Sequence, residues 1–246
     1  MKKILTIIFT ALIVPNVAFA SLFTAQFNDG DSLSDWSVDR SAPAGFQIIN
    51  NELVMTIDGT TESNTDNFHD TRGMKMDLGM QANYLSVDMY IDSLWTNQSE
   101  RYGGIWAVGF SSLFQTNGWG DKTYPILEYQ VDSNGTGGVA KWDSWYGWDS
   151  SLSSLFQMDE FNTFEFIIGT VGVEYFINGA LVHTDGNTQT EYFTDVILNA
   201  KNEGSDFKVR YDNLTYGTVS VPEPTSLALL GLGLASFGFL RKKKKI

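Results

Sequence analysis

The sequence predicts an all-β protein whose central part is a sandwich of two antiparallel sheets. Short runs of β-branched and aromatic residues recur along the chain, separated by clusters of Gly, Asn, Asp and Ser. Between the two termini, no window longer than a few residues keeps the apolar spacing of an amphipathic helix. The segments between the runs are too polar to be crossover helices, so neighbouring runs are expected to pair as antiparallel strands.

The clearest strand candidates are residues 22–27, 52–58, 84–92, 104–111, 124–131, 163–169, 173–178, 192–200 and 207–216. In the run that starts at residue 84, apolar and polar side chains alternate, as they do on a strand with one buried face. Leu85, Val87, Met89 and Ile91 form its apolar face. The sequence Asn178-Gly179 separates two later runs and predicts a tight hairpin, because both positions of such a turn need a positive φ.

The N-terminus is predicted to be a secretory signal peptide over residues 1–20. It has a basic start at positions 2 and 3, an apolar stretch at 4–14 and the small-x-small cleavage site Ala18-Phe19-Ala20. This segment is left out of the fold, and residues 21–220 are expected to form one exported β-sandwich domain.

The C-terminal segment, residues 221–246, is predicted to direct sorting. It contains the triplet Pro222-Glu223-Pro224, an apolar stretch at 227–240 and a basic end at 241–245. The apolar stretch would form a transmembrane helix of about 21 Å, which is short for a hydrocarbon core of about 30 Å. The basic end should stay cytoplasmic, so the tail is expected in the inner membrane during export, with the upstream domain outside.

This arrangement resembles the PEP-CTERM sorting signal of Gram-negative bacteria that make exopolysaccharide and biofilm. The resemblance implies recognition of Pro222, Glu223 and Pro224 by an exosortase, which removes or transfers the tail. It also implies a final location on the outer surface or in the extracellular matrix. An ordinary C-terminal membrane anchor is the alternative interpretation.

Composition excludes several classes of function. Residues 21–220 contain nine Lys and Arg against 28 Asp and Glu, a formal net charge of −19. Such a surface repels phosphate backbones, so nucleic acid is not an expected partner. The chain has no cysteine, which excludes thiol catalysis and Cys-ligated zinc, and only two histidines, which excludes a multi-histidine metal site.

The order of short motifs in the core resembles a concanavalin A-like or laminin-G-like jelly roll. The motifs are Phe-Asn-Asp-Gly at 27–30, Tyr-Phe-Ile-Asn-Gly at 175–179 and Val-Arg-Tyr-Asp-Asn-Leu at 209–214. The resemblance implies a scaffold that often binds glycans and less often cleaves them.

Aromatic residues are densest at 141–149, which suggests a polysaccharide-binding platform formed by Trp142, Trp145, Tyr146 and Trp148. Sugar rings stack on aromatic faces, and the flanking carboxylates can accept hydrogen bonds from hydroxyl groups. If the whole segment were one strand, Trp145 would point away from the other three. Core packing of these rings is the alternative.

Two sets of oxygen ligands are candidates for a structural Ca²⁺. The first is a loop in which Asp132, Asn134, Thr136 and Asp143 occupy positions 1, 3, 5 and 12 of a calcium-loop pattern. A glycine-rich hairpin without metal explains the same residues. The second set is implied by the jelly-roll resemblance and pairs Asp29 or Asp31 with Asp212.

Catalytic motifs are not found in the sequence. Laminarinase-type relatives of the fold carry Glu-x-Asp-x-x-Glu, and the nearest match, Glu128 with Asp132, lacks the third acid. On an extended strand these two carboxylates would lie about 13 Å apart, too far for a retaining pair. Neither His69 nor His183 lies in a nucleophile-elbow sequence.

The sequence therefore predicts an exported protein that is not an enzyme and that binds polysaccharide or contributes structure to a biofilm matrix. A glycoside hydrolase or lyase with an unrecognised site is the first alternative. A structural adhesin without a small ligand is the second.

Overall fold

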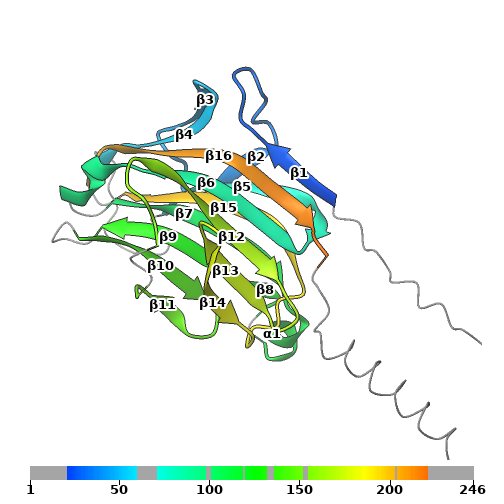
Figure 1. Cartoon of the computed structure of the whole chain (residues 1–246). Coiled ribbons are helices and arrows are strands. Elements are labelled where there is room, and N and C mark those ends of the chain that lie inside the picture. Colours follow the sequence, from blue (N-terminus) through cyan, green and yellow to red (C-terminus); the bar gives the residue numbers. More distant parts are fainter. Residues whose placement is uncertain are drawn as a thin grey trace, which may run out of the picture.

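The protein is a two-layer β-sandwich in the computed structural model, which describes residues 21–59, 71–97, 101–118, 120–131, 136–151, 155–202 and 204–220. Two antiparallel sheets lie face to face, and the helical segments among the described residues are short (Figure 1). The predicted all-β jelly-roll sandwich is confirmed. The signal peptide at 1–20 and the segment at 221–246, with its predicted transmembrane helix and Pro222, Glu223 and Pro224, lie outside the described residues.

The first sheet, sheet A, contains eight of the described strands. Their order is β14 (Ala180–Asp185), β13 (Val173–Ile177), β12 (Glu160–Ile168), β6 (Tyr84–Ile91), β16 (Phe207–Thr218), β4 (Glu52–Ile57) and β3 (Gly45–Ile49), and β1 (Ser21–Ala25) pairs with β16.

The second sheet, sheet B, also contains eight described strands and carries the candidate site. Their order is β11 (Gly147–Asp149), β10 (Gly137–Asp143), β9 (Ile126–Val131), β7 (Arg101–Phe110), β15 (Tyr192–Asn202), β5 (Thr71–Ala82) and β2 (Trp36–Arg40), and β8 (Lys122–Thr123) pairs with β7. The short helices η2 (Ser93–Asn97) and α1 (Ser112–Thr116) connect strands at the ends of the sandwich.

The core lies between the two sheets, and strand alternation builds it. Leu85, Val87, Met89 and Ile91 of β6 are completely buried, as the sequence pattern predicts. Tyr211 of β16 crosses the core, and its hydroxyl lies 3.0 Å from the carbonyl oxygen of Gly104 in sheet B. Apolar side chains therefore fill most of the space between the two sheets, and Tyr211 is one of the polar links that cross it.

Local turns also follow the sequence. Asn178 and Gly179 have φ angles of 51° and 76°, and they connect β13 to β14 through the pair Ile177–Ala180. This left-handed conformation is the one expected for a two-residue hairpin with Asn-Gly.

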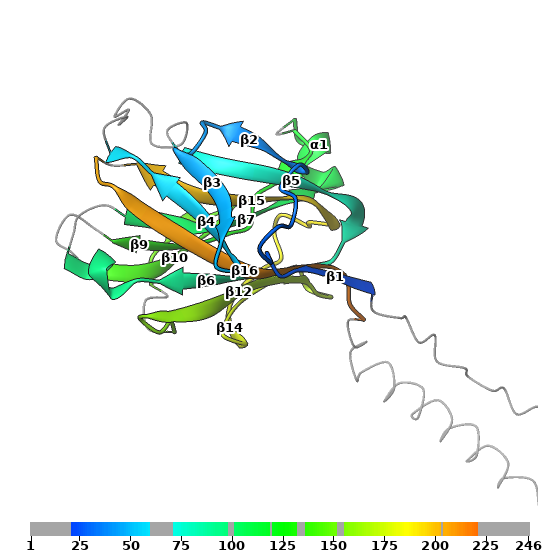
Figure 2. The same ribbon diagram turned by 90° about the horizontal axis from the view of Figure 1, so that it is seen from above.

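The described chain begins and ends at the same edge of the sandwich, where β1 runs beside the last part of β16 (Figure 2). Asn83 holds the end of β16, because its side-chain amide accepts from the Val219 N–H at 2.7 Å and donates to the Val219 carbonyl at 3.0 Å. Among the described residues, no helix has the length and apolar character needed to cross a membrane.

Candidate functional site: a groove on the outer face of sheet B

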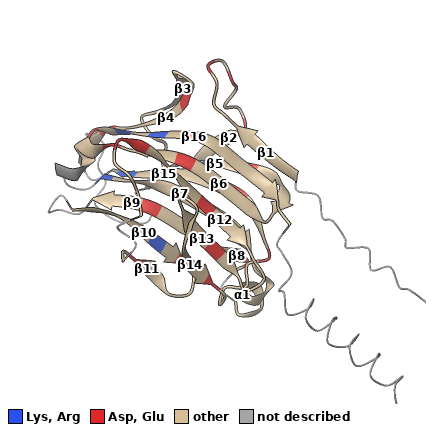
Figure 3. Ribbon diagram, viewed as in Figure 1, with Lys and Arg blue, Asp and Glu red and all other residues tan. Residues whose placement is uncertain are grey.

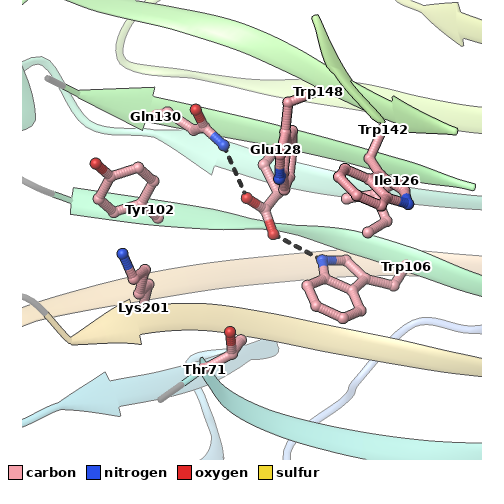
Figure 4. A pocket seen from close by; sticks show the side chains of 9 residues that line it. All are labelled: Thr71, Tyr102, Trp106, Ile126, Glu128, Gln130, Trp142, Trp148 and Lys201. Atoms are coloured by element: carbon pink, nitrogen blue, oxygen red, sulfur yellow. Dashed lines mark hydrogen bonds between the residues drawn. The ribbon is translucent and has the colours of Figure 1, made fainter. Parts of the chain in front are cut away.

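A cavity of about 380 Å³ opens on the face of sheet B that points away from the core (Figure 4). Most of its lining side chains come from β7, β9, β10 and β15, and one comes from the neighbouring hairpin strand β11. The lining residues are Thr71, Tyr102, Trp106, Ile126, Glu128, Gln130, Trp142, Trp148 and Lys201. The wall is mainly apolar, which is typical of a ligand site with a few well-placed polar groups.

The floor of this groove consists of three rows of cross-strand partners, about 7 Å apart because same-face residues on a strand are two positions apart. The first row is aromatic and apolar and runs through Ile197, Trp106, Ile126, Trp142 and Trp148. The second row is Asn199, Gly104 and Glu128, and the third is Lys201, Tyr102 and Gln130. A carboxylate therefore lies between an aromatic row and a polar row.

Glu128 is the centre of the groove and is only 5% exposed. One carboxylate oxygen, Oε1, accepts hydrogen bonds from Trp106 Nε1 at 2.6 Å and Asn199 Nδ2 at 2.7 Å. The other oxygen, Oε2, accepts from Gln130 Nε2 at 3.1 Å (Figure 4). All three partners donate to the carboxylate, so its position is fixed by three hydrogen bonds from neutral groups.

Gly104 makes room for this carboxylate. It lies between Glu128 and Asn199 in the second row, so the Glu128 side chain can cross the β7 backbone to reach Asn199. A Cβ at Gly104 would lie 2.6 Å from Glu128 Cγ, closer than van der Waals packing permits. The glycine is therefore part of the site, although it contributes no chemical group.

Two of the four predicted platform residues, Trp142 and Trp148, form the aromatic wall of the groove. They are cross-strand partners on β10 and β11, with ring centroids 5.6 Å apart in an edge-to-face arrangement. A turn over residues 144–146 separates the two strands, so the single-strand interpretation of the segment is wrong. Trp145 and Tyr146 lie on this turn, are exposed and do not line the cavity.

The structure does not bring the described members of the first calcium set together. Thr136 precedes β10 and Asp143 ends it, so the two are separated by the length of the strand, about 20 Å. Both carboxylate oxygens of Asp143 already have partners, described below. The prediction of Asp143 as the twelfth ligand of that loop is therefore wrong, while Asp132 and Asn134 lie outside the described residues.

The second calcium set lies near the start of β4 and is held by local hydrogen bonds. Asp29 Oδ1 accepts from the Asn51 N–H at 3.1 Å, and Asp31 Oδ2 accepts from the Asn28 N–H at 2.9 Å. Asp212 lies on β16, and burial, followed by the nearby charges of Asp88 and Glu52, raises its pKa. Among the described residues, no three acidic or histidine side chains are grouped so that they could hold a metal ion.

A second polar cluster, which the sequence analysis did not predict, lies under the aromatic wall between the two sheets. Asp143 Oδ2 is 3.1 Å from Lys141 Nζ and 3.1 Å from Nε2 of His183 on β14, and the two nitrogens are 3.3 Å apart. Asp143 Oδ1 accepts from the backbone N–H groups of Trp145 and Tyr146. One carboxylate thus joins β10, the turn and sheet A.

The pKa shifts in this cluster follow from burial and from the lysine. Burial, followed by the charge of Lys141, lowers the pKa of His183 in spite of the opposing effect of Asp143. Burial alone would raise the pKa of Asp143, but hydrogen bonds from the Tyr146 N–H and Lys141 outweigh it and lower that pKa. The folded cluster therefore favours a neutral histidine beside an ammonium–carboxylate pair.

Acidic residues are otherwise spread over strands of both sheets in the view of Figure 3 and are not gathered in one patch. Arg40 provides a cation near the groove, with its guanidinium 4.1 Å from the centroid of the Trp106 ring. Burial lowers the pKa of Arg40, while the neighbouring carboxylates of Asp39 and Glu128 oppose that shift. The groove thus contains one central anion in a surrounding of mixed charge.

Comparison with known proteins finds a similarity for each of the two parts of the chain. Residues 220–243 match the family model of the PEP-CTERM protein-sorting motif. The motif implies an exported protein that an exosortase sorts to the cell surface or the extracellular space. No curated protein matches the chain in sequence.

The fold matches solved structures at low sequence identity. A β-glucanase of Bacillus licheniformis is 11% identical, with a TM-score of 0.52 over 81% of this chain and 99% of that one. Alginate lyase Aly36B is 10% identical, with a TM-score of 0.55 over 84% and 100%. The catalytic domain of a Thermotoga petrophila laminarinase is 11% identical, with a TM-score of 0.50 over 80% and 98%.

These structures contradict the expectation that the domain is not an enzyme, because they are glucanases and a lyase, and that expectation is withdrawn. At such identities the likeness itself shows the fold. The chain thus joins a concanavalin A-like jelly-roll domain to a C-terminal PEP-CTERM sorting motif.

Proposed function

We propose that this exported protein binds a polysaccharide chain in the groove of sheet B and cleaves its glycosidic bonds, with Glu128 as the reactive carboxylate. The setting is the cell surface or a biofilm matrix, where the sorting motif directs the protein and where polysaccharide is abundant. The observation that carries the proposal is the position of Glu128, a buried carboxylate between an aromatic wall and a polar row.

The hydrogen bonds of Glu128 support a role as nucleophile or charge stabiliser. Trp106, Asn199 and Gln130 all donate to it and hold it in one position. A fixed carboxylate in such surroundings stabilises the positive charge that develops at the anomeric carbon when a glycosidic bond breaks. Oε2, which has one protein donor, is the oxygen with room for a substrate.

The aromatic wall supports binding of a sugar ring next to this carboxylate. Trp142 and Trp148 lie in the row adjacent to Glu128, with Trp148 about half exposed. Stacking on such a face orients the sugar and supplies affinity without adding charge. Thus the groove places the aromatic binding surface and the Glu128 carboxylate in neighbouring rows, about 7 Å apart.

The mechanism needs a second group, because a leaving oxygen must be protonated as the bond breaks. Retaining enzymes place the second carboxyl about 5–5.5 Å from the first, and the described lining residues include no acid besides Glu128. Asp132 is the next acid along the chain and follows the end of β9 at Val131, so the spacing of about 13 Å on an extended strand does not fix its distance from Glu128. It is our candidate for this role.

The test uses the full chain in mild detergent with laminarin, mixed-linkage β-glucan and alginate as probes. Reducing ends and the absorbance of unsaturated products are measured for the wild type, Glu128→Gln, Asp132→Asn and the exposed-turn control Asp35→Asn. Glu128→Gln should reduce product formation on the order of 10⁴-fold. The variant should still bind the polysaccharide, so its migration in affinity electrophoresis should be slowed as much as that of the wild type. Undiminished product formation by Glu128→Gln, or no product from any probe with the wild type, contradicts the proposal.

A further inference from the structure

The aromatic wall of the groove lies on an edge hairpin of sheet B, and edge hairpins need a support to keep their side chains in place. The inward face of β10 at this edge carries Lys141 and Asp143, which are 5% and 0% exposed. Trp142 lies between them in sequence and faces the groove, because successive side chains of a strand point to opposite faces. Whatever fixes residues 141 and 143 therefore fixes the direction of Trp142.

Sheet A provides that support from the opposite side of the core. His183 of β14 contacts both buried groups, with Nε2 3.1 Å from Asp143 Oδ2 and 3.3 Å from Lys141 Nζ. Tyr175 of β13 donates its hydroxyl to the Trp142 carbonyl at 3.1 Å, and its ring packs edge-to-face on His183. Two residues of sheet A thus hold the backbone and both neighbours of Trp142.

The same carboxylate also sets the position of Trp148. Asp143 Oδ1 accepts from the Trp145 and Tyr146 N–H groups and so fixes the turn that leads into β11. The turn determines the register of β10 with β11, in which Trp148 lies opposite Trp142. A shift of one residue would move Trp148 to the other face of the strand.

A general need for stability does not explain this cluster. An inward position at the edge of a sandwich is ordinarily apolar, and replacing a buried ion pair with apolar residues often leaves stability unchanged or higher. What a polar cluster adds is a single geometry, because each of its hydrogen bonds requires defined directions.

We propose that Asp143, His183, Lys141 and Tyr175 are positioning residues for the Trp142–Trp148 wall, so that sheet A controls polysaccharide binding on the far face of sheet B. The inference rests on the proposed function for its effect on binding. None of the four residues lines the groove, so their effect on a ligand has to pass through the two tryptophans.

The test compares three variants of the full chain. Tyr175→Phe removes one hydroxyl, and His183→Leu with Tyr175→Phe removes the link to sheet A without leaving a buried charge unpaired. Thr188→Val is the matched control, because it removes a buried hydrogen bond of 2.6 Å to Asp185, at the end of the same strand β14. The probes are laminarin, mixed-linkage β-glucan and alginate in affinity electrophoresis.

A spectroscopic readout follows the wall itself without any ligand. Two indoles 5.6 Å apart give paired circular-dichroism bands in the far ultraviolet, defined here as the part of the spectrum that Trp148→Phe removes. Tyr175→Phe should weaken these bands and the double variant should weaken them further. Thr188→Val should lower the melting temperature and leave the bands unchanged.

Retention of the bound probe should fall two- to tenfold in the double variant, about the value of one aromatic contact. Unchanged bands and unchanged retention in the double variant overturn the positioning role, provided that Trp148→Ala weakens retention. If Trp148→Ala itself leaves retention unchanged, the proposed function fails. The circular-dichroism bands then decide alone whether the cluster positions the wall.

Discussion

Glu128 and Asp143 are both buried carboxylates on adjacent strands of sheet B, yet they lie on opposite faces and have opposite kinds of partner. Glu128 faces the groove and accepts hydrogen bonds from neutral groups, the Trp106 indole and two side-chain amides. Asp143 faces the core and binds an ammonium group, a histidine and two backbone N–H groups.

The difference separates a carboxylate that can do chemistry from one that holds structure. The charge of Asp143 is compensated within the fold, and each of its oxygens has two partners. The hydrogen bonds of Glu128 come from neutral dipoles only, although the Arg40 guanidinium lies nearby. In the proposed mechanism this leaves its charge available to a cationic transition state. Burial alone therefore does not distinguish the two carboxylates, and the choice of Glu128 as the proposed reactive acid rests on the nature of its partners.

The largest loss of stability should come from removing the Asp143 carboxylate. In Asp143→Ala, Lys141 becomes a buried charge without its carboxylate, and two N–H groups of the turn lose their acceptor. Breaking a buried pair in this way costs about 3–5 kcal/mol, which urea unfolding measures as a lower midpoint. Glu128→Gln should lose less than about 1.5 kcal/mol, since the nearby cation Arg40 keeps its ion pair with Asp39.

The control for this contrast is the double variant Lys141→Met with Asp143→Asn. It keeps the volume of both side chains and an acceptor for the turn, and it leaves no unpaired charge in the core. The double variant should therefore be more stable than Asp143→Ala. If Asp143→Ala unfolds at the wild-type urea concentration, the structural role of this carboxylate is wrong.

The next largest loss of stability should come from Gly104→Ala. This substitution affects Glu128 and leaves the Asp143 cluster unchanged. The new methyl group would overlap Glu128 Cγ at 2.6 Å and the backbone of β9. Such overpacking costs about 1–3 kcal/mol, and it should reduce glycan cleavage more than it reduces stability. Gly103→Ala is the control, because its methyl group would meet the Val209 side chain in the core at 3.1 Å. Equal loss of activity in both variants would contradict the specific role of Gly104 in making room for the Glu128 side chain.

The sequence predicts what depends on local patterns. Alternation in β6 identifies its four core residues, and Asn178-Gly179 identifies a hairpin, because in both cases the controlling interactions lie within a few residues. The apolar tail and its Pro-Glu-Pro triplet identify the sorting motif for the same reason.

Sequence reasoning misses what depends on pairs of distant strands. Glu128 lies 24 residues from its partner Gly104 and 71 from Asn199, so no local pattern reveals the row that they form. Asp143 matches a calcium loop by spacing, but it is the last residue of a seven-residue strand that leads away from the rest of that loop. A useful signal was present in Lys141 and Asp143, whose alternation with Trp142 places two charges on the inward face of the strand.

A smaller effect, on polysaccharide binding, should distinguish Trp148 from Trp145 in the aromatic hairpin. Trp148→Ala removes a ring that lines the groove, whereas Trp145→Ala removes one on the exposed turn. Loss of one stacking partner should cost about 0.5–1.5 kcal/mol of binding free energy, measured as weaker retention of laminarin or β-glucan in affinity electrophoresis. Trp145→Ala should change retention little, and the reverse order would place the sugar outside the groove.

The smallest effect is the dependence of the free energy of unfolding on pH. It tests only the cluster around Asp143. Burial and Lys141 lower the pKa of His183 below its ordinary value of 6.5, while Asp143 and Asp185 oppose the shift. As pH falls through 6.5, the unfolded chain binds a proton that the folded His183 does not, so the free energy of unfolding decreases. The slope for one such proton stays below about 1.4 kcal/mol per pH unit, and it is measured by urea unfolding between pH 7.5 and pH 5.5 (about one unit on each side of 6.5).

The background for that measurement is His69→Gln, because His69 is the only other histidine in the chain. In this background His183→Gln should flatten the dependence on pH, since no other side chain in the cluster titrates near neutral pH by its ordinary value. Product formation should keep its own pH profile in both variants, because Glu128 is on the other face of sheet B. An unchanged stability slope in His183→Gln would mean that His183 binds protons equally in the folded and unfolded states. Asp143 and Asp185 would then cancel the effects of burial and of the Lys141 ammonium 3.3 Å from the ring nitrogen, and the lowered pKa of His183 would be wrong.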